Sequence, residues 1–237
     1  MPASNATYVG HIGEVSVVYK PIAGERPLWD FPDGNLAHRE VAAYVVSEAF
    51  GWNVVPQTWL REGPMGLGMV QLWQDIDPEQ AAVTLVATDT TPDGWCHVLD
   101  GFDTADRPVS LIHEDSPELR RMAVFDIVVN NADRKGGHVL EMVDGHRHGV
   151  DHGLTFHSEH KLRTILWGWQ GQALLPDELA GVERVLGGLY ADLGDALAPL
   201  LLDAEIDALA MRCEALLNRA HFPRPRGPMP AVPWPPF

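Results

Sequence analysis

The segment FDIVVNNADRKGGHVL (residues 125–140) carries the strongest structural signal in the 237-residue sequence. An apolar helical run passes directly into Asn-Asn-Ala-Asp-Arg, and a flexible Lys-Gly-Gly then precedes a short strand-like piece. The buried run thus ends by placing the carboxylate of Asp133 beside the guanidinium of Arg134. Taken alone, this pair could be a surface ion pair that contributes less than about 1 kcal/mol. Its meaning depends on what the rest of the chain places near Asp133.

A helix and a hairpin are predicted on either side of this segment. Upstream, Ser116-Pro117-Glu118 combines an N-cap residue, a proline at the first helical position and an acidic first turn. We therefore expect a helix from there to about Asn130. Downstream, HVLEMV and RHGVDHG are typical of two short strands that are joined through Asp144-Gly145 as a hairpin.

The N-terminal third has the predicted order strand, helix, strand. GEVSVVYKP (13–21) alternates polar and apolar residues, as in a half-buried strand, and delivers Lys20 at its end. LAHREVAAYVVSEAF (36–50) has helical spacing with Glu40 near its first turn, and Gly51 ends the helix. GLGMVQLW (66–73) is typical of a buried strand.

The final third is predicted to be helical, with amphipathic segments at 176–193 and 203–220. The proline-rich residues 221–237 are expected to be extended, either as a mobile end or as a strap over the body. Residues 80–115 contain turn signals, and no structure is assigned there. This order suits a small β-rich lobe (1–76), a larger mostly helical lobe (77–220) and a tail (221–237). A cleft between unequal lobes is a natural ligand site.

Composition narrows the class of protein and its partners. Hydrophobic residues make up 46% of the chain, which is enough for one large core or two small lobes. No apolar run approaches the roughly 20 residues of a membrane helix and no signal peptide is evident, so we expect a cytoplasmic protein without stable membrane insertion. The net charge of -16 disfavours nucleic acid and anionic lipid as partners. Two cysteines support neither a disulfide framework nor a cysteine-based zinc site.

Phosphoryl transfer from a nucleotide needs few protein groups. These are a lysine on the phosphates, a carboxylate that orients the lysine, an Asp near the acceptor hydroxyl and oxygen ligands for Mg²⁺. The chain offers a candidate for each in a workable order: Lys20, Glu40, Asp133 with Asn131, and Asp151.

Four motifs in this order resemble the phosphoinositide 3- and 4-kinase catalytic superfamily, and most closely the type II phosphatidylinositol 4-kinases, of which the chain would be a small bacterial-type member. VVYKP (17–21) resembles the nucleotide-lysine strand and GMVQLW (68–73) the hinge strand under adenine. NNADRKGGH (130–138) resembles the catalytic loop, and GVDHGLTF (149–156) the metal-binding segment. LWGWQ (166–170) is similar to the aromatic stretch that follows. The resemblance spans most of the chain and implies a two-lobed, protein-kinase-like α+β fold.

The resemblance also implies roles for individual residues. Asp133 and Arg134 would be the catalytic pair, with Asp133 at the acceptor hydroxyl. The implied metal ligands are Asp151, His138 and Asn131. Glu48 is an alternative to Glu40 as the partner of Lys20, and Phe31 and Val70 are further candidates for the adenine pocket. The implied nucleotide-binding residues are Ser4, Asn5, Thr7, Lys20, Glu40, Gln71, Leu72, Trp73 and Leu154.

His138 departs from the pattern, because the resemblance leads us to expect a metal-binding Asn five residues after Asp133. Imidazole is a poorer ligand for Mg²⁺ than an amide oxygen, so either Asn130 or Asn131 would have to substitute, or the site would use one ion. The cysteine-rich lipidated segment of type II lipid kinases is also missing. The sequence thus predicts a phosphotransferase that uses ATP with Mg²⁺ or Mn²⁺ and acts on a hydroxyl of a small molecule, inositol lipid or protein.

Two other functions fit parts of the sequence. If His138 removes turnover, the chain would be a pseudokinase that serves as a nucleotide-binding regulatory module. The histidine cluster HRHGVDHGLTFHSEH (146–160) comes within one residue of the HxHxDH signature of transition-metal hydrolases. The extra residue would turn one ligand away from the metal, and His146 and His148 would share one face of a hairpin as exposed residues.

Overall fold

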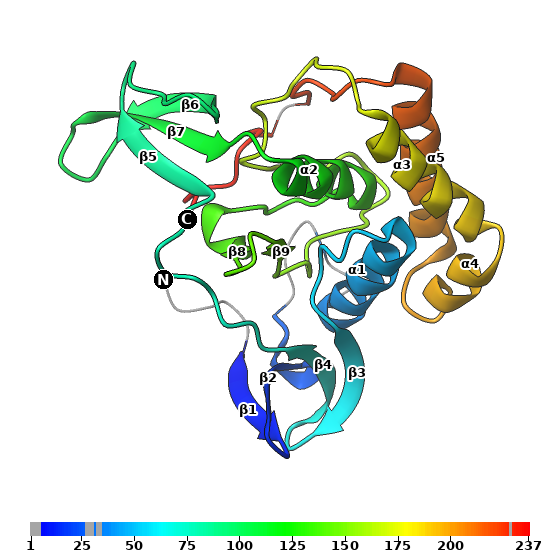
Figure 1. The fold of residues 1–237 in the computed structure, drawn as a ribbon. Coiled ribbons are helices and arrows are strands. Elements are labelled where there is room, and N and C mark those ends of the chain that lie inside the picture. The colour runs from blue at the N-terminus through cyan, green and yellow to red at the C-terminus, as the bar shows by residue number, and fades with distance from the viewer. Residues whose placement is uncertain (1–5, 27–30, 32–34, 228) are drawn as a thin grey trace.

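Strands dominate the N-terminal part of the chain and helices the C-terminal part, as predicted (Figure 1). The structure, a computed structural model, describes residues 6–26, 31, 35–227 and 229–237. The N-terminal lobe is an antiparallel four-stranded sheet with the order β1-β2-β4-β3. Its strands are β1 (Tyr8–Ile12), β2 (Val15–Pro21), β3 (Thr58–Gly63) and β4 (Gly66–Leu72).

The alternation of side chains along β2 places Lys20 on the inner face of this sheet. Val17 and Tyr19 are buried with Val70 in a small apolar cluster, whereas Val18 and Lys20 point to the opposite face, because successive strand residues alternate. Helix α1 (Leu36–Phe50) packs against β3 and β4. It has the predicted bounds, and Gly51 ends it in the left-handed conformation (φ 69°) that favours glycine.

Helix α2 (Pro117–Val129) lies in the middle of the C-terminal lobe (Figure 1). The hydroxyl of Ser116 accepts a hydrogen bond from the Leu119 N–H (3.3 Å), so the predicted N-cap is confirmed. Val124, Phe125 and Val128 are fully buried in a core that α1, α2 and the C-terminal helices share. Those helices are α3 (Pro176–Leu189), α4 (Asp192–Leu197) and α5 (Asp203–Arg219). In the described part of the chain, no helix has the length and apolarity needed to span a membrane.

Residues 80–115, to which the sequence assigned no structure, contain a three-stranded antiparallel sheet. Its strands are β5 (Val83–Ala87), β6 (Trp95–Phe102) and β7 (Pro108–Glu114), in the order β5-β7-β6. The register between β6 and β7 shifts at His97, which breaks the alternation by which a strand is recognised. Leu111 and Val83 pack this sheet against the main core.

The predicted hairpin after residue 138 is present as β8 (Val139–Glu141) and β9 (Arg147–Gly149), which pair antiparallel. A short 3₁₀-helix, η2 (Gly136–His138), precedes β8, and another, η1 (Ile22–Gly24), follows β2. The loop at 130–135 therefore joins helix α2 to the hairpin.

A buried ion pair fixes this loop to α2. Both oxygens of Asp126 accept hydrogen bonds from Arg134, from Nε (2.9 Å) and Nη2 (2.8 Å), and neither side chain is exposed. Arg134 also donates to the carbonyls of His138 (3.0 Å) and Val150 (3.3 Å) and contacts Nε2 of His152 (2.7 Å). One guanidinium thus joins the helix, the loop and the segment after β9.

The proline-rich tail is a strap and not a mobile end where the structure describes it. The carbonyl of Ala231 accepts hydrogen bonds from the Thr164 N–H (3.0 Å) and the Trp167 indole (2.9 Å). The carbonyl of Pro236 accepts one from the Gly136 N–H (2.8 Å). The tail therefore returns across the C-terminal lobe to the loop that carries Asp133.

We expect Arg134→Met to lower the free energy of unfolding by about 3–5 kcal/mol, because it leaves the Asp126 carboxylate buried without its partner. Arg121→Met is the matched control, since Arg121 pairs with Asp177 near the surface (3.1 Å) and should cost less than about 1 kcal/mol. Urea unfolding of both variants measures the difference. The double variant Arg134→Met, Asp126→Leu should recover part of the loss. Equal losses in the free energy of unfolding for Arg134→Met and Arg121→Met would contradict the view that the Arg134–Asp126 pair is a buried ion pair.

A second prediction concerns His148 on β9, which is 7% exposed and lies with its ring centroid 4.4 Å from that of His146. Burial, aided by the neighbouring His146, lowers the pKa of His148 from 6.5 to about 4. The unfolded chain therefore takes up this proton more readily, so the stability contribution is complete above about pH 6.5 and is lost as the pH falls towards 4.

The free energy of unfolding should thus fall by up to about 3 kcal/mol from this group over that range. His148→Gln should flatten the pH dependence measured by urea unfolding, whereas His11→Gln, at an exposed position, should keep the full slope. Identical slopes in the two variants would refute the assignment.

Candidate active site

A cleft of about 1010 Å³ lies between the two lobes. The N-terminal lobe lines it with β2, β4 and α1, and the C-terminal lobe with the 133–138 loop, β8 and residues 150–154. The tail lines it as well. Most of the residues that the sequence analysis selected line this cleft: Thr7, Lys20, Glu40, Gln71, Leu72, Trp73, Asp133, His138, Asp151 and Leu154. Ser4 and Asn5 lie outside the described residues.

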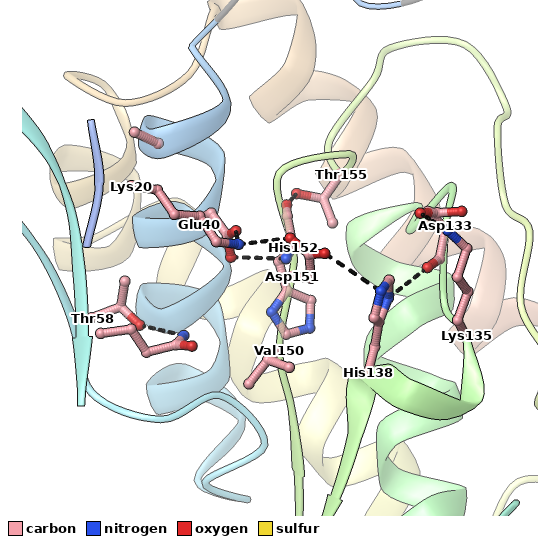
Figure 2. Close-up of polar contacts among 12 residues, drawn as sticks. Lys20, Glu40, Thr58, Asp133, Lys135, His138, Val150, Asp151, His152 and Thr155 are labelled. Carbon is pink, nitrogen blue, oxygen red and sulfur yellow. Dashed lines mark hydrogen bonds and ion pairs between the residues drawn. The ribbon is translucent and has the colours of Figure 1, made fainter. Parts of the chain in front are cut away.

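Lys20 joins the two lobes at the centre of the cleft. Its Nζ donates to Oε1 of Glu40 on α1 (2.7 Å) and to Oδ1 of Asp151 in the C-terminal lobe (2.6 Å), as Figure 2 shows. The other oxygen of Glu40 accepts a hydrogen bond from the His152 N–H (2.8 Å). Glu48, the alternative partner, is exposed on the far part of α1. Three segments that are distant in the sequence therefore meet at one lysine.

The charges at this junction stabilise one another. Burial opposes the positive charge of Lys20, but the carboxylates of Glu40 and Asp151 outweigh it and raise the lysine pKa above its ordinary value. The side chain of Asp151 keeps part of its surface exposed, and although the surrounding cleft walls favour its neutral form, Lys20 with His138 holds its pKa below the ordinary value. Burial raises the pKa of Glu40, against the opposing effect of Lys20. Lys20 and Asp151 are consequently charged at neutral pH.

Asp133 faces the cleft from the opposite side, with 24% of its side chain exposed. Its backbone N–H donates to Oδ1 of Asn131 (3.0 Å), and its carboxylate pairs with Nζ of Lys135 (3.0 Å). The carbonyl of Asp133 accepts a hydrogen bond from Nδ1 of His138 (2.9 Å). The loop therefore holds the Asp133 backbone on both sides while its carboxylate remains accessible.

Arg134 and Asn131 do not reach the cleft, which corrects two of the predicted roles. Arg134 is fully buried on Asp126, beneath the loop, and cannot touch a substrate. Asn131 is buried, and its amide donates to Asp126 (2.9 Å) and accepts from the Asp133 N–H (3.0 Å), so its oxygen faces the loop backbone and not the cleft. The side chain of Asn130 also bonds backbone groups: its amide nitrogen donates to the carbonyls of residues 157 and 159, and its oxygen accepts from the N–H of residue 161. All three side chains position the loop.

His138 lies between Asp133 and Asp151 in Figure 2. Because a carbonyl oxygen can only accept, Nδ1 of His138 carries the proton that bonds the Asp133 carbonyl. Burial lowers the pKa of His138, so the ring is neutral and Nε2 presents a lone pair, 3.4 Å from Oδ2 of Asp151. Two electron-rich atoms that face each other in this way suit a cation bound between them.

The apolar residues that line the cleft differ in part from the predicted ones. Leu72 and Leu154 line it as expected, together with Val18, Leu140 and Val150, which sequence reasoning missed. Val70 belongs to the cluster on the outer face of the sheet. Phe31 packs edge-on against His157, with ring centroids 5.3 Å apart. Neither Val70 nor Phe31 lines the cleft. The lining of the cleft therefore gives no support to the adenine predictions for Val70 and Phe31.

Gln71 is buried and held in place, because its amide donates to the hydroxyl of Thr58 (2.9 Å), which in turn donates to the carbonyl of Pro56. The tail residues Trp234, Pro235 and Phe237 also line the cleft. The sequence carried no spacing signal for them, since a proline-rich segment has no periodicity that indicates where it packs.

The histidine cluster at 146–160 does not assemble a metal site. Within the described residues, no group of three or more His, Cys, Asp or Glu side chains could hold a metal ion. His146 bonds the carbonyl of Asn53 (2.8 Å), and His152 contacts Arg134. His148 is buried, so the expectation that it is exposed is wrong. The observed contacts give no support to the hydrolase interpretation.

The fold is shared with a known kinase. The crystal structure of the Helicobacter pylori proinflammatory kinase CtkA matches with a TM-score of 0.50 and 12% sequence identity, over 93% of this chain and 91% of that one. At this identity the match shows the fold alone, which is two-lobed and kinase-like. No protein-family model matches the sequence.

Sequence comparison identifies a much nearer relative. Protein Rv2133c of Mycobacterium tuberculosis is 47% identical over 248 aligned residues, which cover 99% of this chain and 89% of the relative. The match therefore spans both lobes of this chain. The chain therefore belongs to the same family as Protein Rv2133c of Mycobacterium tuberculosis.

Proposed function

We propose that this protein is an ATP-dependent phosphotransferase that moves the γ-phosphoryl group to an alcohol. The observation that carries the proposal is the double contact of Lys20 with Glu40 and Asp151 in the wall of the cleft, with Asp133 on the other side. A lysine held by a carboxylate, together with two further aspartates, is the set of groups that phosphoryl transfer uses. The two-lobed fold, which the chain shares with a proinflammatory kinase, supports the same reaction.

The charge of the cleft supports a requirement for a divalent cation. Its described lining contains five carboxylates, from Glu25, Glu40, Asp75, Asp133 and Asp151, but only two lysines, Lys20 and Lys135. Both lysines are already paired with carboxylates. A triphosphate would therefore meet repulsion unless cations came with it. Asp151, through its 53% exposed side chain, and Nε2 of His138 are the residues that would hold Mg²⁺ or Mn²⁺.

When bound, such a cation would neutralise the phosphate oxygens as the bond to the leaving group breaks. In the proposed step, Lys20 binds the phosphates and Asp133 orients the acceptor hydroxyl. The hydroxyl oxygen forms a bond to the γ-phosphorus, the bond from that phosphorus to the β–γ bridging oxygen breaks, and ADP leaves. Asp133 accepts the hydroxyl proton. Arg134 and Asn131 act indirectly, by holding the loop that carries Asp133.

The acceptor class is also part of the proposal. The order of the four motifs resembles phosphoinositide 3- and 4-kinases, which points to a hydroxyl acceptor. The overall charge of -16 disfavours approach to an anionic membrane surface, so a soluble alcohol is preferred to a lipid.

We expect Lys20→Met to impair ATP binding and Asp133→Asn to impair ATP consumption. Lys20→Met should weaken ATP binding at least about tenfold, because it removes the cation that meets the phosphates. Asp133→Asn should bind ATP normally but reduce ATP consumption by about 100-fold or more, the size of a lost general base. Calorimetry with ATP and Mg²⁺ measures the first effect, and ATP consumption with a small-molecule extract measures the second.

Matched controls are Lys161→Met and Asp195→Asn, since neither residue lines the cleft. Both should behave like the wild type in both assays. If Lys20→Met and Lys161→Met bind ATP equally well, the nucleotide site has been placed wrongly.

A nucleotide-binding module without turnover is the second candidate, and the position of His138 favours it. An imidazole is a poorer ligand for Mg²⁺ than the amide oxygen of Asn. His138→Asn should therefore raise Mg²⁺-dependent ATP consumption, by about tenfold if the metal site limits turnover. His146→Asn, outside the cleft, should have no effect.

The same assay separates the two candidates. Turnover in the wild type that rises in His138→Asn supports the enzyme. ATP binding without turnover in either protein supports the module. A fall in turnover on His138→Asn contradicts the view that the imidazole weakens the metal site.

A further inference from the structure

The tail is built into the cleft as a fixed wall. Ala231 accepts two hydrogen bonds from the 164–167 segment, Val232 packs against the main core and Pro233 is buried. Beyond these anchors, Trp234, Pro235 and Phe237 line the cleft. These contacts fix the tail on both sides of Trp234, since the Pro236 carbonyl is bonded to the Gly136 N–H (2.8 Å).

The wall stands at the end of the cleft where the acceptor must bind. Gly136, which contacts the tail, is three residues from Asp133 in the same loop. The ring of Phe237 lies so close to Gly136 that a Cβ atom there would be 2.5 Å from a ring carbon. The glycine therefore lets the tail approach the catalytic loop. The cleft retains its volume of about 1010 Å³ with the tail in place, so the tail bounds the cleft and does not fill it.

The surface that this wall offers is aromatic. Trp234 is 78% exposed and Phe237 48% exposed, although both line a cleft. An indole face that is left open in a concave site provides a flat apolar surface with little rotamer freedom to lose, which suits the face of another ring. Aromatic and other apolar side chains form most of the lining of small-molecule sites.

The charges near the wall favour a neutral ligand. Lys135 is the nearest cation in the loop, and it is paired with Asp133 (3.0 Å). Lys20 is held by two carboxylates. In the proposed reaction Lys20 binds the nucleotide, and Lys135 is paired with Asp133, so among the described lining residues a phosphate or carboxylate on the acceptor would find no free lysine.

We propose that residues 231–237 form the acceptor wall of the cleft and select a neutral alcohol that carries its hydroxyl on a ring. The ring packs on Trp234, and the hydroxyl reaches Asp133. This inference rests on the proposed phosphotransfer for the role of Asp133, but the ring-binding surface itself can be tested without turnover.

The test measures binding of matched probes by saturation-transfer NMR, with a non-hydrolysable ATP analogue and Mg²⁺ present. The first pair is myo-inositol and sorbitol, which have the same numbers of carbons and hydroxyls but differ in ring closure. The second pair is N-acetyltyrosinamide and N-acetylserinamide. Inositol 1-phosphate tests the charge preference. We expect the ring member of each pair to give a signal about threefold stronger or more, and the phosphate to weaken binding.

Two variants test the wall itself. Trp234→Ala should reduce the ring signals to the level of the acyclic probes, and because the side chain is mostly exposed it should not change the melting temperature. Gly136→Ala pushes a methyl group against Phe237 and should also remove the ring preference. Trp59→Ala, at an exposed tryptophan on β3 outside the cleft lining, is the control and should keep it.

Equal signals from ring and acyclic probes in the wild type, or no binding of any ring probe, would overturn the inference. A ring preference that survives Trp234→Ala would do the same. A rise in ATP consumption on Trp234→Ala would identify the tail as an inhibitory lid instead. If the protein binds no ATP but still prefers ring probes in a way that depends on Trp234, the result would support the acceptor wall and refute the proposed phosphotransfer.

Discussion

The ion pair between Arg134 and Asp126 is the interaction on which the site depends. A fully buried guanidinium and carboxylate are stable only when every donor and acceptor is matched, and removing either partner leaves a costly buried charge. Arg134 meets this requirement by bonding to α2, to the end of the loop that carries Asp133 and to the segment before Asp151. Gly149 leaves room for the guanidinium of Arg134, because a Cβ atom at position 149 would lie 2.8 Å from Nη2 of Arg134. The positions of Asp133 and Asp151 are therefore set by one side chain that never enters the cleft.

The two lobes are coupled through Glu40. One of its oxygens accepts from Lys20 in the N-terminal lobe and the other from the His152 N–H in the C-terminal lobe. Helix α1 carries Glu40 and also shares the main core with α2 and α3. The lysine strand is thus fixed relative to Asp151 by both a hydrogen-bond chain and apolar packing. Glu40 and the shared core thus hold the groups of the cleft together from both lobes.

Local signals in the sequence predicted the elements that have strong boundaries. Ser116 and Pro117 marked the start of α2, and Gly51 marked the end of α1, because caps leave a recognisable residue at a fixed place. The order of the motifs predicted that Lys20, Asp133 and Asp151 lie together, and all three line one cleft. The sheet β5-β7-β6 was missed because its strands are half exposed and one contains a register shift. The roles of Asn131, Arg134 and Val70 could not be read from spacing, since a motif fixes the position of a residue in the chain and not the direction of its side chain.

The path of the tail has a practical consequence for handling the protein. Phe237 packs on Gly136, so any residues that follow Phe237 would start at the cleft, close to the loop that carries Asp133. An affinity tag fused there would crowd the site. An internal position in the turn between β6 and β7, around Asp106, is exposed and lies outside the cleft lining, which makes it the better place for a tag or a fluorophore.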